Sequence, residues 1–153
     1  MKIRPKTIWT MSLSGECQTD ARTEVRVRDL SVMLDEPVNR GGTNHGLMPM
    51  ETLMAALIGC TNVITHKIAQ ANDIEIKEMS VRVDATVNSA GTRLVKEIDI
   101  PFPAVTLYIE LTTSADDDAV GVLKTNLRRH CAISKVLQQA GTKVNEVWTV
   151  NRP

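Results

Sequence analysis

The chain has 153 residues, of which 42% are hydrophobic, and this is the size of one ordinary domain. Lysine plus arginine and aspartate plus glutamate both number 18, so no overall field attracts nucleic acid or an anionic membrane, and neither is expected as a partner. The first fifteen residues hold no apolar run of signal-peptide length, and no segment approaches the roughly 20 apolar residues of a membrane span, which indicates a cytoplasmic protein.

The N-terminal part of the chain predicts short strands. A first strand is expected around residues 7–13. Apolar residues then fall on odd positions in residues 25–27 and on even positions in residues 30–34. Because side chains alternate faces along a strand, this change of phase predicts a turn or bulge near Arg28 and Asp29.

A long helix is predicted from about Pro49 to Ala71. Proline suits the first helical turn, where its missing N–H leaves no bond unmade. The glycine-rich residues 39–46 before it lack the lysine-serine/threonine ending of a phosphate-binding loop, so they are predicted to be a plain loop. An apolar stripe at helical spacing supports the helix; it consists of Leu53, Leu57, Cys60, Ile64 and Ile68.

The second half of the chain predicts further strands and helices. Apolar and polar residues alternate over residues 81–87 and 105–111, as in strands with one buried face. A helix is expected after Ser114, whose hydroxyl would form a capping box with Asp117.

A short helix over residues 132–140 should follow and stop at Gly141, and a final strand is expected around residues 144–150. Strands, a long helix, strands, helices and a strand, with no linker between them, predict a single α+β domain over residues 1–153.

The three cysteines differ in their local setting. Cys60 on the apolar stripe is either a small core residue or a reactive thiol. Cys131 lies where one helix ends and the next begins, a position at which backbone N–H groups stabilise a thiolate. His130 beside it either adds charge or is a solvated residue of the last turn. Cys17 lies in a polar stretch and is predicted to be incidental.

An odd cysteine count in a reducing compartment points to free or catalytic thiols. A metal site is not expected, because the sequence has no closely spaced pair of cysteine or histidine ligands such as CxxC or HxxxH. A cysteine-histidine hydrolase stays open, since that pairing is spatial and leaves no spacing signature.

Residues 46–60, GLMPMETLMAALIGC, together with Gly41-Gly42 before them, resemble the central-helix signature of the OsmC/Ohr family. His130-Cys131 and the residues after it resemble that family's later cysteine segment, which typically reads Cys-Pro. The resemblance implies an α+β fold with antiparallel sheets packed around a long central helix, in an intertwined homodimer.

The resemblance also implies roles for the cysteines. Cys60 would be the peroxidatic thiol of a thiol-dependent peroxidase that reduces organic hydroperoxides, and Cys131 the resolving thiol. A Cys60 sulfenic acid would be captured as a Cys60–Cys131 disulfide and then reduced by an external dithiol, possibly of lipoyl type. No metal or other cofactor is implied.

Two departures from the Ohr branch concern further site residues. That branch has an acidic residue directly after the helix-initiating proline, whereas here Met50 follows Pro49 and the acid is Glu51. It also has an arginine in a glycine-rich N-terminal turn; Arg22 is the nearest candidate, with Arg26 and Arg40 as rivals. Pro-Met-Glu looks closer to the OsmC-like side branch.

These departures leave a second hypothesis about function open beside the peroxidase. In this alternative, the protein is a non-catalytic OsmC-like dimer that binds an apolar metabolite in its interface cleft. Cys60 would line that cleft, and Met48, Met50 and Met54 would supply adaptable contacts.

Overall fold

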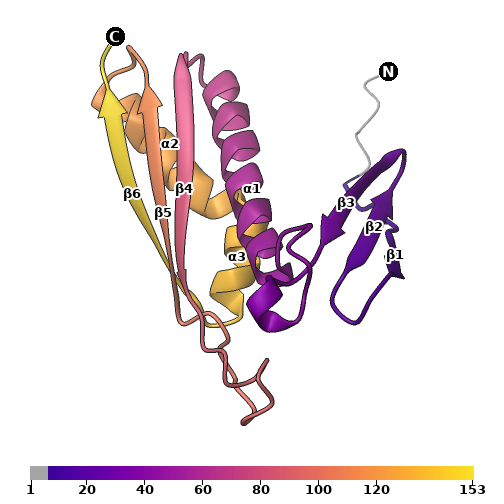
Figure 1. The fold of residues 1–153 in the computed structure, drawn as a ribbon. Coiled ribbons are helices and arrows are strands. Elements are labelled where there is room, and N and C mark those ends of the chain that lie inside the picture. The colour runs from indigo at the N-terminus through magenta and orange to yellow at the C-terminus, as the bar shows by residue number, and fades with distance from the viewer. Residues whose placement is uncertain (1–6) are drawn as a thin grey trace. The chain divides into compact units, whose positions relative to one another are not determined.

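A computed structural model describes residues 7–153. It forms two compact units, one up to Thr52 and the other from Leu53 to Pro153, and each contains a three-stranded sheet (Figure 1). The expectation of one domain over residues 1–153 stays a prediction.

The first unit is built on an antiparallel meander of β1 (Ser14–Cys17), β2 (Thr23–Val27) and β3 (Leu30–Leu34). Val27 pairs with Leu30, so the connection is a two-residue turn, and Arg28 adopts a φ of 56° in it. The predicted turn is confirmed. It sets odd residues of β2 opposite even residues of β3, and so gathers both apolar sets on one face of the hairpin.

The prediction of a strand over residues 7–13 is wrong, because these residues form no regular secondary structure. The first strand begins at Ser14, which pairs with Arg26. No described strand pairs with residues 7–13, and Ile8 and Trp9 there are 84% and 65% exposed. An apolar pattern becomes a strand only where a hydrogen-bonding partner is available.

The second unit contains the sheet β4-β5-β6, built from β4 (Glu78–Thr86), β5 (Ala104–Thr112) and β6 (Lys143–Asn151). The three strands predicted here are confirmed. β4 and β5 are antiparallel, but β6 runs parallel to β5, so this sheet is mixed rather than antiparallel as expected. The chain reaches β6 through α2 (Asp117–His130) and α3 (Ala132–Gln139), and such a helical crossover returns the chain in the parallel direction.

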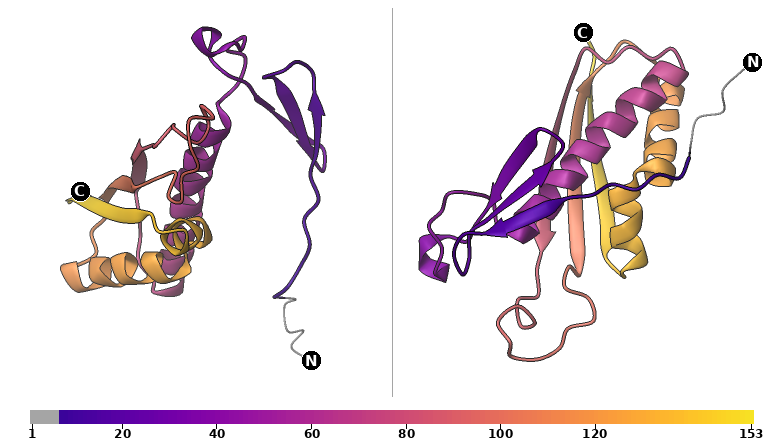
Figure 2. Two further views of the ribbon diagram at one scale, coloured as in Figure 1. Left: turned by 90° about the horizontal axis from the view of Figure 1, so that it is seen from below. Right: turned by 90° about the vertical axis from the view of Figure 1, so that its right-hand side faces the viewer.

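The core of this unit lies between the sheet and three helices. α1 (Pro49–Ala71), α2 and α3 lie over the same face of the sheet (Figures 1 and 2). The face of β5 toward them is almost wholly buried. The side chains that fill the core include Leu57, Val105, Leu107, Ile109, Leu111, Leu123, Leu127 and Leu137.

The helix predicted over residues 49–71 is confirmed, but its buried face differs from the predicted stripe. Thr61 and Thr65 are fully buried, whereas Cys60 and Ile64 flank them and are only half-buried. The hydroxyl of Thr61 donates to the carbonyl oxygen of Leu57 at 2.8 Å, which satisfies a polar group inside the core.

By length and composition α1 is also apolar enough to cross a membrane. It has 23 residues and a window with a mean hydropathy of 1.2, although no membrane-length segment was expected from the sequence. A core helix of a soluble protein meets the same criterion, and here α1 covers the sheet of the second unit.

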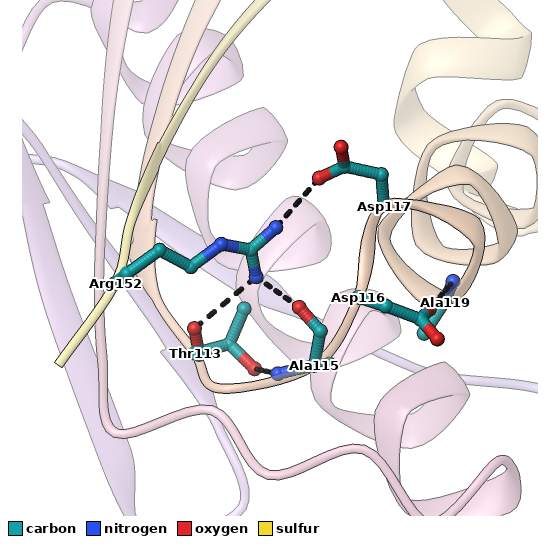
Figure 3. A network of polar contacts seen from close by, with 6 residues as sticks. All are labelled: Thr113, Ala115, Asp116, Asp117, Ala119 and Arg152. Atoms are coloured by element: carbon teal, nitrogen blue, oxygen red, sulfur yellow. Dashed lines mark hydrogen bonds and ion pairs between the residues drawn. The ribbon is translucent and has the colours of Figure 1, made fainter.

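The start of α2 is fixed two residues later than predicted. Asp116, not Ser114, is the N-cap, and its carboxylate accepts from the backbone N–H of Ala119 at 2.9 Å. Figure 3 shows that Arg152, just after β6, holds the same turn. Its guanidinium donates to the carbonyl oxygens of Thr113 and Ala115 and pairs with Asp117 at 2.6 Å.

Candidate functional site

Two cysteines 71 residues apart meet within the second unit. Cys60 projects from the middle of α1, and Cys131 occupies the single residue between α2 and α3. Its ψ of 106° interrupts the helical path, while its backbone N–H still bonds the carbonyl oxygen of Leu127. The Cys131 thiol donates to the Cys60 sulfur with an Sγ–Sγ distance of 2.9 Å.

The two thiols are not equivalent. Both are free, but Cys60 is half-buried and Cys131 is only 1% exposed. Burial, and next the hydrogen bond to Cys60, raises the pKa of Cys131 to about 11, although backbone N–H groups at Ser134 and Ile133 act in the opposite direction. The helix N-terminus expected to stabilise a Cys131 thiolate is therefore outweighed by burial.

This arrangement suits stepwise thiol chemistry. A thiolate is the reactive form of cysteine, and access governs which thiol meets a dissolved reagent. Cys60 is the accessible member, and Cys131 is a protonated neighbour. Closing 2.9 Å to a disulfide bond of about 2.05 Å requires only a small displacement of the side chains.

A hollow lies in the same unit between the C-terminal half of α1 and the last turns of α2. Its volume is about 410 Å³. Neither cysteine lines it, although Ile64 is one helical turn beyond Cys60 and His130 precedes Cys131. Sequence reasoning missed this hollow, although two of its residues belong to the predicted apolar stripe. It is lined by Ile64, Lys67, Ile68, Ala71, Asn72, Asn126 and His130.

Glu51 belongs to the first unit and caps α1. Its carboxylate accepts from the backbone N–H of Met48 at 2.9 Å, which is one half of a capping box. The side chain is exposed. This contact explains the residue as part of the first helical turn, and its role toward the thiols stays a prediction.

The candidate arginines also lie in the first unit, and their partners differ. Arg26 pairs with Glu24 at 2.8 Å, and Arg40 points a guanidinium nitrogen at the sulfur of Met48. Arg22 forms no ion pair with a described residue. Its Nη1 donates to the hydroxyl of Thr43 at 3.4 Å, and its buried Nε has no acceptor among residues 7–153.

Thr43 connects Arg22 to a buried carboxylate that sequence reasoning missed. Asp35 is fully buried and accepts from the Thr43 hydroxyl at 2.5 Å and from the backbone N–H of His45 at 3.0 Å. These hydrogen bonds, that of Thr43 first, hold the pKa of Asp35 well below its usual range. Backbone N–H groups of Glu36 and Thr43 also donate to it.

The glycine-rich loop is shaped around this carboxylate. A Cβ at Gly42 would lie 1.9 Å from the Glu36 carbonyl oxygen, and one at Gly46 would lie 2.2 Å from that of Met33, so neither position accepts a side chain. Because Asp35 already occupies the N–H groups of Thr43 and His45, the loop does not offer them to a phosphate.

Cys17, predicted to be incidental, is exposed on β1, where the Thr23 hydroxyl lies 3.8 Å from its sulfur. Over residues 7–153, no three histidine, cysteine or acidic side chains come together in an arrangement that could hold a metal ion.

Comparison with known proteins finds one family. The family model for OsmC-like protein matches residues 42–147, which is most of the chain and includes both cysteines of the pair. No curated protein sequence matches the chain.

Solved structures share the fold at low sequence identity. An OsmC-like protein from Mycoplasma pneumoniae is 16% identical with a TM-score of 0.79, over 94% of this chain and 98% of the other. An organic hydroperoxide resistance protein OsmC from Legionella pneumophila is 15% identical with a TM-score of 0.70, over 94% and 99%.

An organic hydroperoxide resistance protein from Elizabethkingia anophelis, with crystallant-derived thiocyanate bound, is 16% identical. Its TM-score is 0.69, over 96% of this chain and 100% of the other. Similarity at these identities concerns the fold.

Proposed function

Because the chain belongs to the OsmC-like protein family, we propose that it is a thiol-dependent peroxidase that reduces organic hydroperoxides. Two similar structures carry the name organic hydroperoxide resistance protein. The observation that carries the proposal is the pair of free thiols, 2.9 Å apart and unequally exposed.

The proposed reaction has two steps. The Cys60 thiolate attacks the terminal oxygen of the hydroperoxide, the O–O bond breaks, and an alcohol leaves after taking up a proton. Cys60 is now a sulfenic acid. The Cys131 sulfur attacks the Cys60 sulfur, forming a disulfide and releasing water, and an external dithiol then reduces this disulfide and is itself oxidised.

We further propose that this chemistry takes place in a cytoplasmic homodimer in which both units form one domain. Arg22 and Glu51 are the proposed auxiliary residues, and the proposed reductant is a dithiol of lipoyl type. The buried Nε of Arg22, which lacks an acceptor among the described residues, supports a role in holding an anionic group.

Counting thiols tests the function directly. The protein is incubated with stoichiometric cumene hydroperoxide, and free thiols are then titrated under denaturing conditions. We expect two of the three thiols to be lost, Cys17 to remain, and dithiol to restore the other two. Three remaining thiols would contradict the proposal.

The order of attack predicts different behaviour of two variants. Cys60→Ser should abolish hydroperoxide consumption. Cys131→Ser should consume one equivalent per chain and then stop, leaving Cys60 as a sulfenic acid that dimedone traps. Mass spectrometry of the trapped protein checks this. An unmodified Cys60 in Cys131→Ser, with oxidised Cys131 in Cys60→Ser, would reverse the roles, and Cys17→Ser serves as the control.

A second candidate function is a non-catalytic dimer that binds an apolar metabolite. The hollow of about 410 Å³ favours it, since Ile64, Ile68 and Ala71 provide it with an apolar lining, although Cys60 does not line it. In this case apolar ligands would bind saturably to Cys60→Ser, and hydroperoxides would not be consumed by the unaltered protein.

A further inference from the structure

The hollow between α1 and α2 has an elongated apolar floor. The C-terminal half of α1 lies beside α2 (Figures 1 and 2), and the volume between them, about 410 Å³, is in the range of pockets that hold small molecules. The side chains that α1 contributes recur at helical spacing, as Ile64, Lys67, Ile68 and Ala71. They form one stripe about 10.5 Å long, which suits an extended chain better than a bulky group.

Lys67 and His130 give this hollow a positively charged end. Both line it, both are exposed, and neither forms an ion pair within residues 7–153. Cys131 contacts Cys60, so α2 runs back along α1 from that point. His130 therefore lies toward the start of the α1 stripe, where Lys67 is, and Asn126 lies toward its end.

The other polar groups of the hollow leave this charge in place. The side-chain amides of Asn72 and Asn126 donate to carbonyl oxygens of their own helices at 2.8 and 3.1 Å. Within residues 7–153, no acidic side chain lines the hollow. Asp73 and Asp118 are the nearest acids along the two helices, and both lie beyond the asparagine end. The ammonium of Lys67 is therefore not neutralised from within the hollow.

We propose that the hollow binds an aliphatic monocarboxylate, with its carboxylate at Lys67 and His130 and its chain along Ile68 and Ala71. A carboxylate accepts charge-assisted hydrogen bonds from an ammonium, and an imidazole offers an N–H in either protonation state. The aliphatic chain removes the apolar floor from water. A second polar group on the chain would lose its hydration there without gaining a partner. This inference goes beyond the peroxidase, because neither cysteine lines the hollow.

Isothermal titration calorimetry tests the proposal with the full chain under reducing conditions. The probe is octanoate, whose extended length is close to that of the α1 stripe. Octanoate should bind saturably, one per chain, and about ten-fold more tightly than octanol, because hydrogen bonds to a charged group are stronger than those to a neutral one. No saturable binding of octanoate, or equal affinities for octanoate and octanol, would overturn the proposal. Cys60→Ser should bind octanoate like the parent, so the outcome does not depend on peroxidase activity.

Two substitutions separate the charged end from the apolar floor. Lys67→Gln and His130→Gln should each weaken octanoate binding about five-fold and leave octanol binding unchanged, because exposed charged contacts contribute modestly. Ala71→Glu should weaken both ligands, since it places a carboxylate where the chain lies. Lys143→Gln, at the start of β6 and outside the hollow, is the exposed control, and circular dichroism checks the folding of each variant.

The pattern across these variants decides between the site and a general charge effect. An equal loss of octanoate affinity in Lys143→Gln and Lys67→Gln would contradict the proposal. So would unchanged affinity in both Lys67→Gln and His130→Gln. A change of oligomeric state in these two variants without a loss of octanoate affinity would assign the hollow to contact between copies of the chain and overturn the proposal.

Discussion

Cys131 is the residue on which the order of the proposed chemistry depends. Its burial and its hydrogen bond to Cys60 raise its pKa to about 11, so at neutral pH it keeps its proton. A protonated, buried thiol is a poor first nucleophile. It becomes an effective second nucleophile once Cys60, whose sulfur lies 2.9 Å away, is a sulfenic acid. The closeness of the two sulfur atoms then compensates for the low reactivity of the protonated Cys131 thiol.

Alkylation measures this difference. At pH 8, a thiol with a pKa of about 11 is ionised to about one part in a thousand, so iodoacetamide should modify Cys131 at least about 100-fold more slowly than exposed Cys17. Because the thiolate is the reactive form, the rate at Cys131 should rise about ten-fold per pH unit and level off only near pH 11. Peptide mass spectrometry over time checks both. Equal rates at Cys17 and Cys131 would refute the assignment.

Among the elements, the N-terminus of α2 shows how caps decide where a helix begins. Ser114 and Asp117 satisfy a capping-box pattern, yet Asp116 supplies the cap. The Asp116 carboxylate accepts a hydrogen bond from the Ala119 N–H. Arg152, which lies near the C-terminal end of the sequence, donates to the carbonyl oxygens of Thr113 and Ala115 just before the helix. That contact joins residues far apart in sequence, so local pattern reasoning did not include it.

Removing the cap should cost stability. Asp116→Ala leaves the Ala119 N–H without its acceptor, and we expect a loss of about 1 kcal/mol in the free energy of unfolding. Ser114→Ala, the matched control, should change it by less than about 0.5 kcal/mol. Urea titrations followed by circular dichroism measure both. A larger loss of stability in Ser114→Ala than in Asp116→Ala would instead support the capping box that the sequence predicted at Ser114.

Elements with a strong local signal were predicted correctly. Pro49 and the period of the apolar residues set α1, and strict alternation set β5. The strand predicted over residues 7–13 is wrong because strand formation requires a partner. The parallel direction of β6 agrees with the two helices predicted between β5 and β6, whereas the antiparallel expectation came from the family resemblance alone.

At the scale of the whole molecule, the site was only partly predictable. Family resemblance singled out Cys60 and Cys131, but no spacing rule connects two residues 71 apart, and their contact required the fold. Asp35 was missed because its donors are mostly backbone N–H groups, which any sequence supplies. The sequence shows Gly42 and Gly46, but not that the close approach of the Glu36 and Met33 carbonyl oxygens requires glycine at these two positions.

The exposed apolar surface of the first unit supports the proposed homodimer. Trp9 is 65% exposed, and Leu30 and Val32, on the apolar face of the hairpin, are 55% and 46% exposed. The apolar face of the hairpin, exposed in this way, favours burial against another surface. A second chain could supply that surface, and it could also supply catalytic residues.

Glu51 offers the sharpest test of a shared site. Residues nine apart on a helix are separated by about 13.5 Å and about 180°, so Glu51 cannot touch Cys60 of its own α1. A catalytic Glu51 must therefore act on the partner chain. Glu51→Gln is the informative change, since the amide oxygen still accepts the Met48 N–H and only the charge is lost.

We expect Cys60→Ser and Glu51→Gln homodimers to be inactive and strongly impaired, respectively, and their mixed dimer to recover one working site. That site combines Cys60 of one chain with Glu51 of the other. Differently tagged chains, co-expressed and purified through both tags, provide the mixed dimer, and hydroperoxide consumption per dimer is measured. Recovery no greater than the mean of the two homodimers would refute the shared site. Full activity of Glu51→Gln alone would leave Glu51 with capping as its only role, because glutamine preserves the bond to Met48.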